Sequence, residues 1–163
     1  MTTWKNNNTL ESRRLVEEVL GSTEEPEKVV ARDEEHLKWI IKERMLYQGP
    51  NCDLNDIDVS HVTYMDGLFK GSKFNGDISQ WDVSNVTNMR EMFEGSVFNG
   101  DISNWDVSNV TDMGWMFQRS KFSGDISGWD VSGAVYMKNM FLKSPLDGKE
   151  PDWYKAYMKP INS

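Results

Sequence analysis

Aspartates at a fixed spacing are the side chains in this sequence whose type and position most suggest chemistry. One recurs every 24 residues, always followed by Val-Ser, and the set comprises Asp58, Asp82, Asp106 and Asp130. An ionised carboxylate accepts hydrogen bonds, either from nearby backbone N–H and hydroxyl groups or from the basic groups of a partner. This column of aspartates therefore predicts either a local structural role or an acidic surface for a basic partner.

Polar residues around the column extend this candidate surface, which we expect to be the concave face of the protein. On adjacent strands about 4.8 Å apart, neighbouring aspartates would repel each other by about 1 kcal/mol, and a basic partner would offset that repulsion. The candidate partner-binding residues on this face are Asp58, Gln80, Asp82, Ser84, Asn104, Asp106, Ser108 and Asp130. A second column follows turn residues and is interpreted as turn-capping; its members are Asp53, Asp77, Asp101 and Asp125.

A tryptophan that departs from the repeat is the second candidate for an interface. Trp115 stands where the other copies have the smaller or more polar residues Gly67, Glu91 and Asn139. An exposed tryptophan on the helical side would suit an interface anchor, and we expect Arg90 and Arg119 to rim the same convex patch. Alternatively, the Trp115 side chain covers a gap left by Gly114.

Residues that could support catalysis or metal binding are scarce. The chain has two histidines, His36 and His61, and one cysteine, Cys52, and they show no metal-ligand spacing. No Gly-rich phosphate loop precedes a helix, and nothing separates the pKa values of paired carboxylates. We therefore predict that the protein is not an enzyme and binds no metal or cofactor.

An internal repeat of 24 residues must position these side chains. Its copies are 50–73 (PNCDLNDIDVSHVTYMDGLFKGSK), 74–97 (FNGDISQWDVSNVTNMREMFEGSV), 98–121 (FNGDISNWDVSNVTDMGWMFQRSK) and 122–145 (FSGDISGWDVSGAVYMKNMFLKSP). A single copy cannot bury its own apolar face, so stacked copies must create the core.

The apolar pattern inside one copy predicts a short strand followed by a helical turn. Ile78, Trp81 and Val83 have the L-x-x-L-x-L spacing of a strand, and apolar residues over 86–93 recur at three- and four-residue steps. We expect the methionines, tryptophans and phenylalanines at repeated positions to form core ladders.

The string G-D-I-S-x-W-D-V-S-N-V-T-x-M-x-x-M-F, which recurs in phase over residues 50–145, resembles the repeat of BspA-like leucine-rich-repeat (LRR) proteins. That family is common in bacterial surface proteins and also occurs in mycoplasmas, phages and large viruses. The resemblance implies an LRR-like α/β solenoid and a role in adhesion or protein recognition. We expect a short right-handed solenoid with a small parallel sheet.

The two ends of the repeat region are interpreted as caps. Residues 1–49 contain two helix-like apolar stripes, one at residues 10–20 and one within residues 27–48, and predict a helical N-terminal cap. These N-terminal helices also offer a route to a homo-oligomer. Residues 146–163 supply the apolar bulk of a C-terminal cap.

Composition limits the classes of partner. The net charge of −8 disfavours binding to nucleic acid or anionic lipid, and no apolar run is long enough to span a bilayer. The N-terminus lacks the apolar stretch of a secretory signal, so we expect a cytoplasmic protein, or a surface protein if a signal was removed.

These observations predict a non-catalytic protein-recognition module, such as a phage- or mobile-element-encoded binder that blocks or recruits a host protein. One alternative is a bacterial surface fragment that acts in adhesion or host interaction. A second alternative is an acidic mimic of nucleic acid that occupies the basic groove of another protein.

Overall fold

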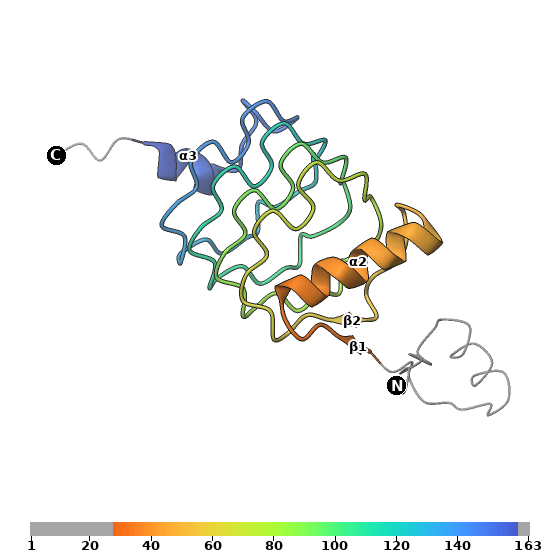
Figure 1. The fold of residues 1–163 in the computed structure, drawn as a ribbon. Helices are drawn as coiled ribbons and strands as arrows, with labels where there is room; N and C mark the ends of the chain where they lie inside the picture. Colours follow the sequence, from red (N-terminus) through yellow and green to blue (C-terminus); the bar gives the residue numbers. More distant parts are fainter. Residues whose placement is uncertain (1–27, 160–163) are drawn as a thin grey trace, which may run out of the picture.

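The computed structural model describes residues 28–159, which contain few helices and strands. In chain order these are β1 (Val29–Val30), α2 (Glu34–Gln48), β2 (Ile57–Asp58) and α3 (Asp152–Met158) (Figure 1). β1 and β2 pair in parallel. The apolar stripe predicted at residues 10–20 lies outside the described residues. Within residues 28–159, no helix has the length and apolar character needed to cross a membrane.

The chain between α2 and α3 winds into layers that lie side by side (Figure 1). We call residues 50–73, 74–97, 98–121 and 122–145 coils 1 to 4. Parallel bridges join residues 24 positions apart in consecutive coils, along the series Tyr64, Asn88, Asp112 and Tyr136. Backbone N–H groups of coils 1 to 3 also donate to carbonyls of the next coil, for example Met65 to Asn88 at 2.8 Å. The 24-residue spacing is therefore the spacing of backbone contacts between layers.

Tight turns replace the helical turn expected over residues 86–93. The N–H of Met92 donates to the carbonyl of Met89 at 3.2 Å, which closes a turn of four residues. Glu91 and Gly95 have φ angles of 57° and 65°, in the left-handed region. A left-handed residue interrupts a right-handed helix. The chain here is a series of turns, and the backbone N–H groups of alternate residues donate to the next coil.

The strand expected through Trp81 and Val83 is also replaced by turns. The N–H of Val86 donates to the carbonyl of Val83 at 2.9 Å, so the chain bends directly after this segment. Both Trp81 and Val83 are nevertheless buried. Within residues 50–145 the only extended segment longer than an isolated bridge is β2. The apolar spacing identifies the side chains that enter the core, but it does not identify the backbone conformation that places them there.

Aromatic ladders fill the core, as the repeated positions predict. Buried phenylalanine rings stack nearly parallel, with centroids 5.5–5.9 Å apart, in the order Phe69, Phe93, Phe117 and Phe141. Each buried indole Nε1–H donates to a carbonyl of the preceding coil at 2.9–3.2 Å, Trp81 to Leu54, Trp105 to Ile78 and Trp129 to Ile102. Burial of each large apolar side chain contributes about 1.5–3 kcal/mol. The ladders therefore supply much of the stability and hold the layers in register.

α2 packs against coil 1. Its first turn is capped by the Asp33 carboxylate, which accepts from the N–H of His36 at 2.8 Å, and Gly49 ends it. Leu37, Ile40 and Ile41 are buried. The helix predicted within residues 27–48 is shorter than expected, because β1 occupies residues 29–30 and pairs with β2 before the chain turns at Asp33.

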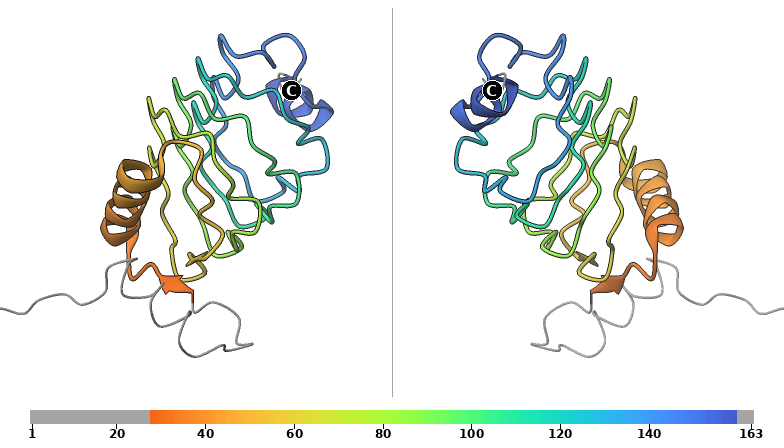
Figure 2. Two further views of the ribbon diagram at one scale, coloured as in Figure 1. Left: turned by 90° about the vertical axis from the view of Figure 1, so that its right-hand side faces the viewer. Right: turned by 90° about the vertical axis from the view of Figure 1, so that its left-hand side faces the viewer.

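α3 lies at the other end of the stack from α2 (Figure 2). Trp153, 24 residues after Trp129, donates its indole N–H to the carbonyl of Ile126 at 3.0 Å. Tyr154 packs edge-on against Phe141, with ring centroids 5.0 Å apart. Trp153 follows Trp129 by one repeat length and so continues the tryptophan series. The sequence spacing alone could therefore have predicted this indole hydrogen bond.

Candidate interaction surfaces

The aspartates of the first column each form a local turn with the serine two residues later. Asp82 Oδ1 accepts from the N–H and the hydroxyl of Ser84 at 3.1 and 2.6 Å, and Asp106 Oδ1 accepts from the same groups of Ser108 at 3.1 and 2.7 Å. The corresponding N–H donors to Asp58 and Asp130 are Ser60 at 3.0 Å and Ser132 at 2.9 Å. The local structural role predicted for the column is therefore present. In all four residues the second carboxylate oxygen accepts no hydrogen bond from residues 28–159.

These contacts favour the ionised form of three aspartates in the column. The N–H of Ser60 lowers the pKa of Asp58, and the N–H of Ser132 lowers the pKa of Asp130. For Asp106, the hydroxyl of Ser108 contributes most to the lowered pKa. A hydrogen bond to the charged form favours that form. The column thus holds four carboxylates in local turns, each with one acceptor oxygen that receives no hydrogen bond from residues 28–159.

The second column of aspartates has the same local geometry. Asp77, Asp101 and Asp125 each accept from the N–H of the serine two residues later at 2.9 Å, and Asp53 accepts from Asn55 at 2.8 Å. The two columns are therefore matched in type and number, and they differ in their place on the surface. This match provides a control for experiments that remove charge from the first column.

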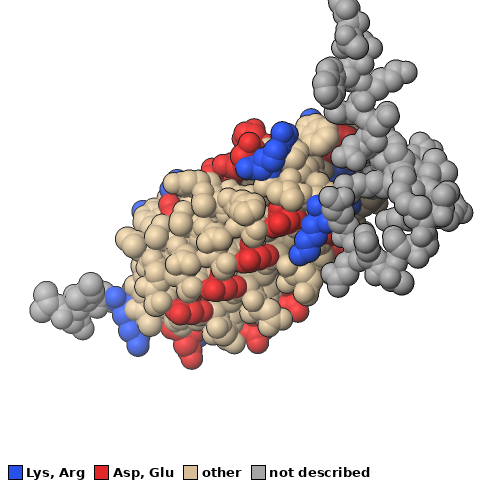
Figure 3. Space-filling view, turned by 90° about the horizontal axis from the view of Figure 1, so that it is seen from below, with Lys and Arg blue, Asp and Glu red and all other residues tan. Residues whose placement is uncertain are grey.

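The other polar residues predicted on this face are exposed or partly exposed. Gln80 and Asn104 are exposed, and Ser84 and Ser108 are partly buried in their turns with aspartate. The N–H of Gln80 donates to Asn55 Oδ1 in the preceding coil at 2.8 Å. The face seen from below, on the side where β2 lies, carries acidic side chains in a row (Figure 3). That row extends across several coils.

Trp115 is partly buried, and the prediction of an exposed tryptophan is wrong. The guanidinium of Arg90 lies 4.2 Å from the centre of the Trp115 ring, and the Tyr136 ring lies 5.5 Å away. Three consecutive coils thus contribute to this cluster. The side chain over Gly114 is Tyr136, since a Cβ at Gly114 would come within 2.5 Å of its ring. Tyr136 of coil 4 thus lies over Gly114.

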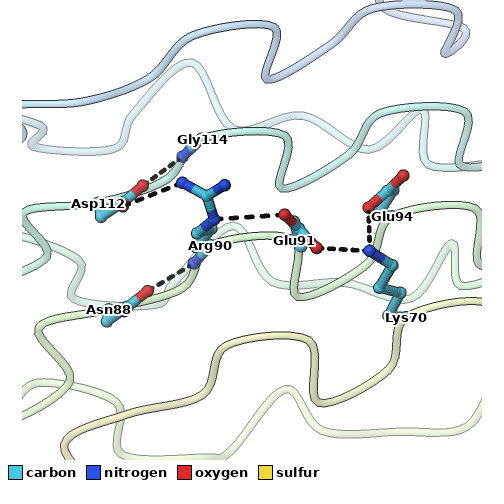
Figure 4. A network of polar contacts seen from close by, with 7 residues as sticks. All are labelled: Lys70, Asn88, Arg90, Glu91, Glu94, Asp112 and Gly114. Carbon is cyan, nitrogen blue, oxygen red and sulfur yellow. Dashed lines mark hydrogen bonds and ion pairs between the residues drawn. The ribbon is translucent and has the colours of Figure 1, made fainter.

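Arg90 belongs to a polar network that joins neighbouring coils, whereas Arg119 does not (Figure 4). The Arg90 side chain contacts Glu91 at 3.3 Å and Asp112 at 3.9 Å. Lys70 then bridges Glu91 and Glu94. Arg119 is exposed, and its side chain makes no polar contact with the residues that the structure describes. Of the convex patch predicted from Trp115, Arg90 and Arg119, the structure brings Trp115 and Arg90 into contact and leaves Arg119 exposed.

The residues considered for metal or redox chemistry do not gather at one place. Among residues 28–159, no group of three or more His, Cys, Asp or Glu side chains is placed to hold a metal ion. Cys52 is buried, and this burial raises the pKa of its thiol. The ring of His36 stacks on that of Trp39 on the surface of α2.

The coils match a known protein family. Residues 42–152 match the family described as "Mycoplasma protein of unknown function, DUF285". That range covers the end of α2, all four coils and the start of α3. No curated protein and no solved structure matches the chain significantly.

Proposed function

The chain belongs to the DUF285 family, and we propose that it is a non-catalytic module that recognises a basic protein surface through its first aspartate column. The partner-binding residues are Asp58, Asp82, Asp106 and Asp130, together with the exposed Gln80 and Asn104 beside them. A phage- or mobile-element-encoded binder of a host protein fits this role.

The fixed carboxylates carry this proposal. Each has one oxygen held by a serine N–H and a second oxygen free to accept from a partner. Side chains held in one conformation lose little entropy when they bind. Four like charges across neighbouring layers repel one another, and lysine or arginine groups of a partner would relieve that repulsion. The same negative charge disfavours a direct approach to phosphate backbones.

We also propose that the layered coils form an LRR-like solenoid related to the BspA-like repeat. Three observations support this proposal: backbone bridges between residues 24 apart, stacked rings at repeated positions, and caps at both ends of the stack. Such arrays present extended surfaces to macromolecular partners, and they bind with residues from several repeats.

A capture experiment with two matched variants tests the function. The first variant changes Asp58, Asp82, Asp106 and Asp130 to asparagine, and the second changes Asp53, Asp77, Asp101 and Asp125 to asparagine. Asparagine keeps the acceptor oxygen of each turn and removes the charge. The wild-type protein and the second variant should retain the same basic protein from a host lysate, and the first variant should lose it. Equal retention by the two variants would remove the first column as the binding surface.

A further inference from the structure

Backbone N–H groups form a ladder that runs through the stack in one direction. In coil 3, the N–H groups of Met113, Trp115, Phe117 and Arg119 donate to carbonyls of coil 4 at 2.8–3.0 Å. Equivalent residues of coils 1 and 2 donate to the following coil in the same way. Each coil therefore offers four donors, on alternate residues, to the layer that follows it.

In coil 4 this ladder is only half satisfied. The N–H of Met137 donates to the Tyr157 hydroxyl at 3.2 Å, and the N–H of Lys143 donates to Asp147 Oδ2 at 2.7 Å. Between them, the N–H groups of Asn139 and Phe141 have no acceptor within residues 28–159. These two donors are therefore open to an acceptor from outside the described residues.

A hollow of about 310 Å³ lies beside these two residues. Its lining includes Asn139, Phe141, Leu142, Asp147, Glu150 and Tyr154. Asp147 uses one carboxylate oxygen to accept from Lys143, and Glu150 uses one to accept from the N–H of Gly148. The hollow thus combines an apolar wall, two backbone donors, two carboxylates and Lys155, whose ammonium donates to Asp152 at 3.2 Å. Tyr154 and Met158 of α3 belong to its lining, and α3 lies at the opposite end of the stack from α2 (Figure 2).

We propose that this hollow binds a peptide segment of another protein, which pairs with the two open N–H groups of coil 4 beside α3. The N–H groups of Asn139 and Phe141 donate to two peptide carbonyls two residues apart, as Trp115 and Phe117 donate to Lys138 and Met140 one coil earlier. Addition of a segment to an open backbone edge is a known mode of peptide recognition. Basic side chains of the peptide lie beside Asp147 and Glu150. This surface is separate from the first aspartate column, so either proposal can fail alone.

The probe is a capped synthetic peptide that copies residues 136–143, YMKNMFLK, since coil 3 already binds the carbonyls of this segment. It is titrated into the full-length ¹⁵N-labelled protein and followed by NMR. We expect the amide signals of Asn139 and Phe141 to show the largest shifts. A control peptide with both lysines changed to glutamate should bind several-fold more weakly, by roughly threefold or more. Largest shifts at other amides, or none at Asn139 and Phe141, overturn the proposal.

A backbone change tests the donors directly. Incorporation of the α-hydroxy analogue at Phe141 replaces its N–H by an ester oxygen and keeps the side chain. This change should weaken peptide binding by about fivefold, the typical effect of one lost hydrogen bond. The melting temperature should fall only slightly, because this N–H has no acceptor among the described residues and the ester only weakens the Met140 carbonyl as acceptor of the Phe117 N–H. The same change at Phe117, whose N–H donates to Met140 at 2.9 Å, should lower the melting temperature. Unaltered peptide affinity in the Phe141 ester contradicts the proposed contact.

Discussion

Trp153 donates its indole N–H to the carbonyl oxygen of Ile126 at 3.0 Å, as Trp129 does to Ile102 one coil earlier. The two indole rings stack with their centroids 6.5 Å apart. Because Trp153 belongs to α3, this pair of contacts continues the tryptophan ladder into the C-terminal helix. The ladder therefore anchors the cap in the register of the coils.

Removal of the Trp153 donor should destabilise the whole stack. Trp153→Phe keeps an aromatic ring, but it removes the indole donor to the Ile126 carbonyl, which then accepts only from the N–H of Trp129, and it weakens the stacking on Trp129. We expect the free energy of unfolding in urea to fall by about 2 kcal/mol. Trp39→Phe is the control, because Trp39 is 58% exposed on α2, and it should change stability by less than about 0.5 kcal/mol. Equal effects of the two substitutions would contradict the anchoring role.

The left-handed backbone conformation of Arg119 predicts that glycine at this position stabilises the protein. Arg119 has a φ angle of 55°, and glycines occupy the same repeat position at Gly71 and Gly95, with φ angles of 64° and 65°. An L-residue in this region carries a cost of roughly 1–2 kcal/mol, part of which is offset because glycine increases the entropy of the unfolded chain. Arg119→Gly should therefore raise the free energy of unfolding by up to about 1 kcal/mol.

Lys121→Gly is the matched control for that substitution. Lys121 is exposed and lies outside the left-handed region, so glycine gives no relief there and lowers stability by about 0.5–1 kcal/mol. Urea unfolding followed by circular dichroism compares the two variants. A loss of stability in both would show that the left-handed conformation at Arg119 carries no cost.

The Tyr136 ring leaves no room for a Cβ at Gly114. We therefore predict that a larger residue there destabilises the protein and that removal of the Tyr136 ring relieves the effect. A Cβ added here would meet the ring of Tyr136 at 2.5 Å. Gly114→Ala should lower the free energy of unfolding by about 1–3 kcal/mol through overpacking. In a Tyr136→Ala background the same substitution should cost less than about 0.5 kcal/mol, because the clashing ring is gone. Additive effects in this double-mutant cycle would contradict the contact.

Stability should fall at acidic pH because of the aspartate turns. The serine N–H groups hold the pKa values of Asp77, Asp101 and Asp125 below the ordinary value of 3.8. A group whose pKa is lower in the folded state stabilises the fold above its ordinary pKa, and this contribution is lost as the pH falls through the folded-state pKa. The melting temperature should therefore be nearly constant above about pH 5 and should decrease below about pH 4.

A triple variant separates these turns from other acidic groups. Asp77→Asn, Asp101→Asn and Asp125→Asn together keep the acceptor oxygens but cannot titrate. The decrease in melting temperature below about pH 4 should be smaller in this variant than in the wild type. Identical pH profiles would show that the turns make no contribution to the acid sensitivity.

The core could be predicted from the sequence because repeated apolar positions depend on the spacing alone. Trp81, Met89 and Phe93 are buried as predicted. The backbone could not be predicted in the same way. Residues 86–93 satisfy the spacing of a helix, but the left-handed residue that interrupts them is Glu91, a residue type that gives no signal for this conformation.

The candidate surfaces were predictable to different degrees. Hydrogen bonds from Ser84 to Asp82 are local and follow from the Asp-Val-Ser sequence. The surroundings of Trp115 depend on Arg90 and Tyr136, which come from two other coils. Spacing within one copy cannot show such contacts between layers. The open donors of Asn139 and Phe141 likewise emerge only when the ladder is followed to its last coil.

Isothermal titration of the captured basic protein would test most directly whether the first aspartate column binds a partner. The wild type is compared with the two variants described above, in which Asp58, Asp82, Asp106 and Asp130, or Asp53, Asp77, Asp101 and Asp125, are changed to asparagine. Loss of the first column should weaken binding by about 10- to 100-fold, whereas loss of the second should change it by less than about threefold. Higher salt should also weaken the wild-type complex. Equal affinities for the two variants would contradict recognition through the first column.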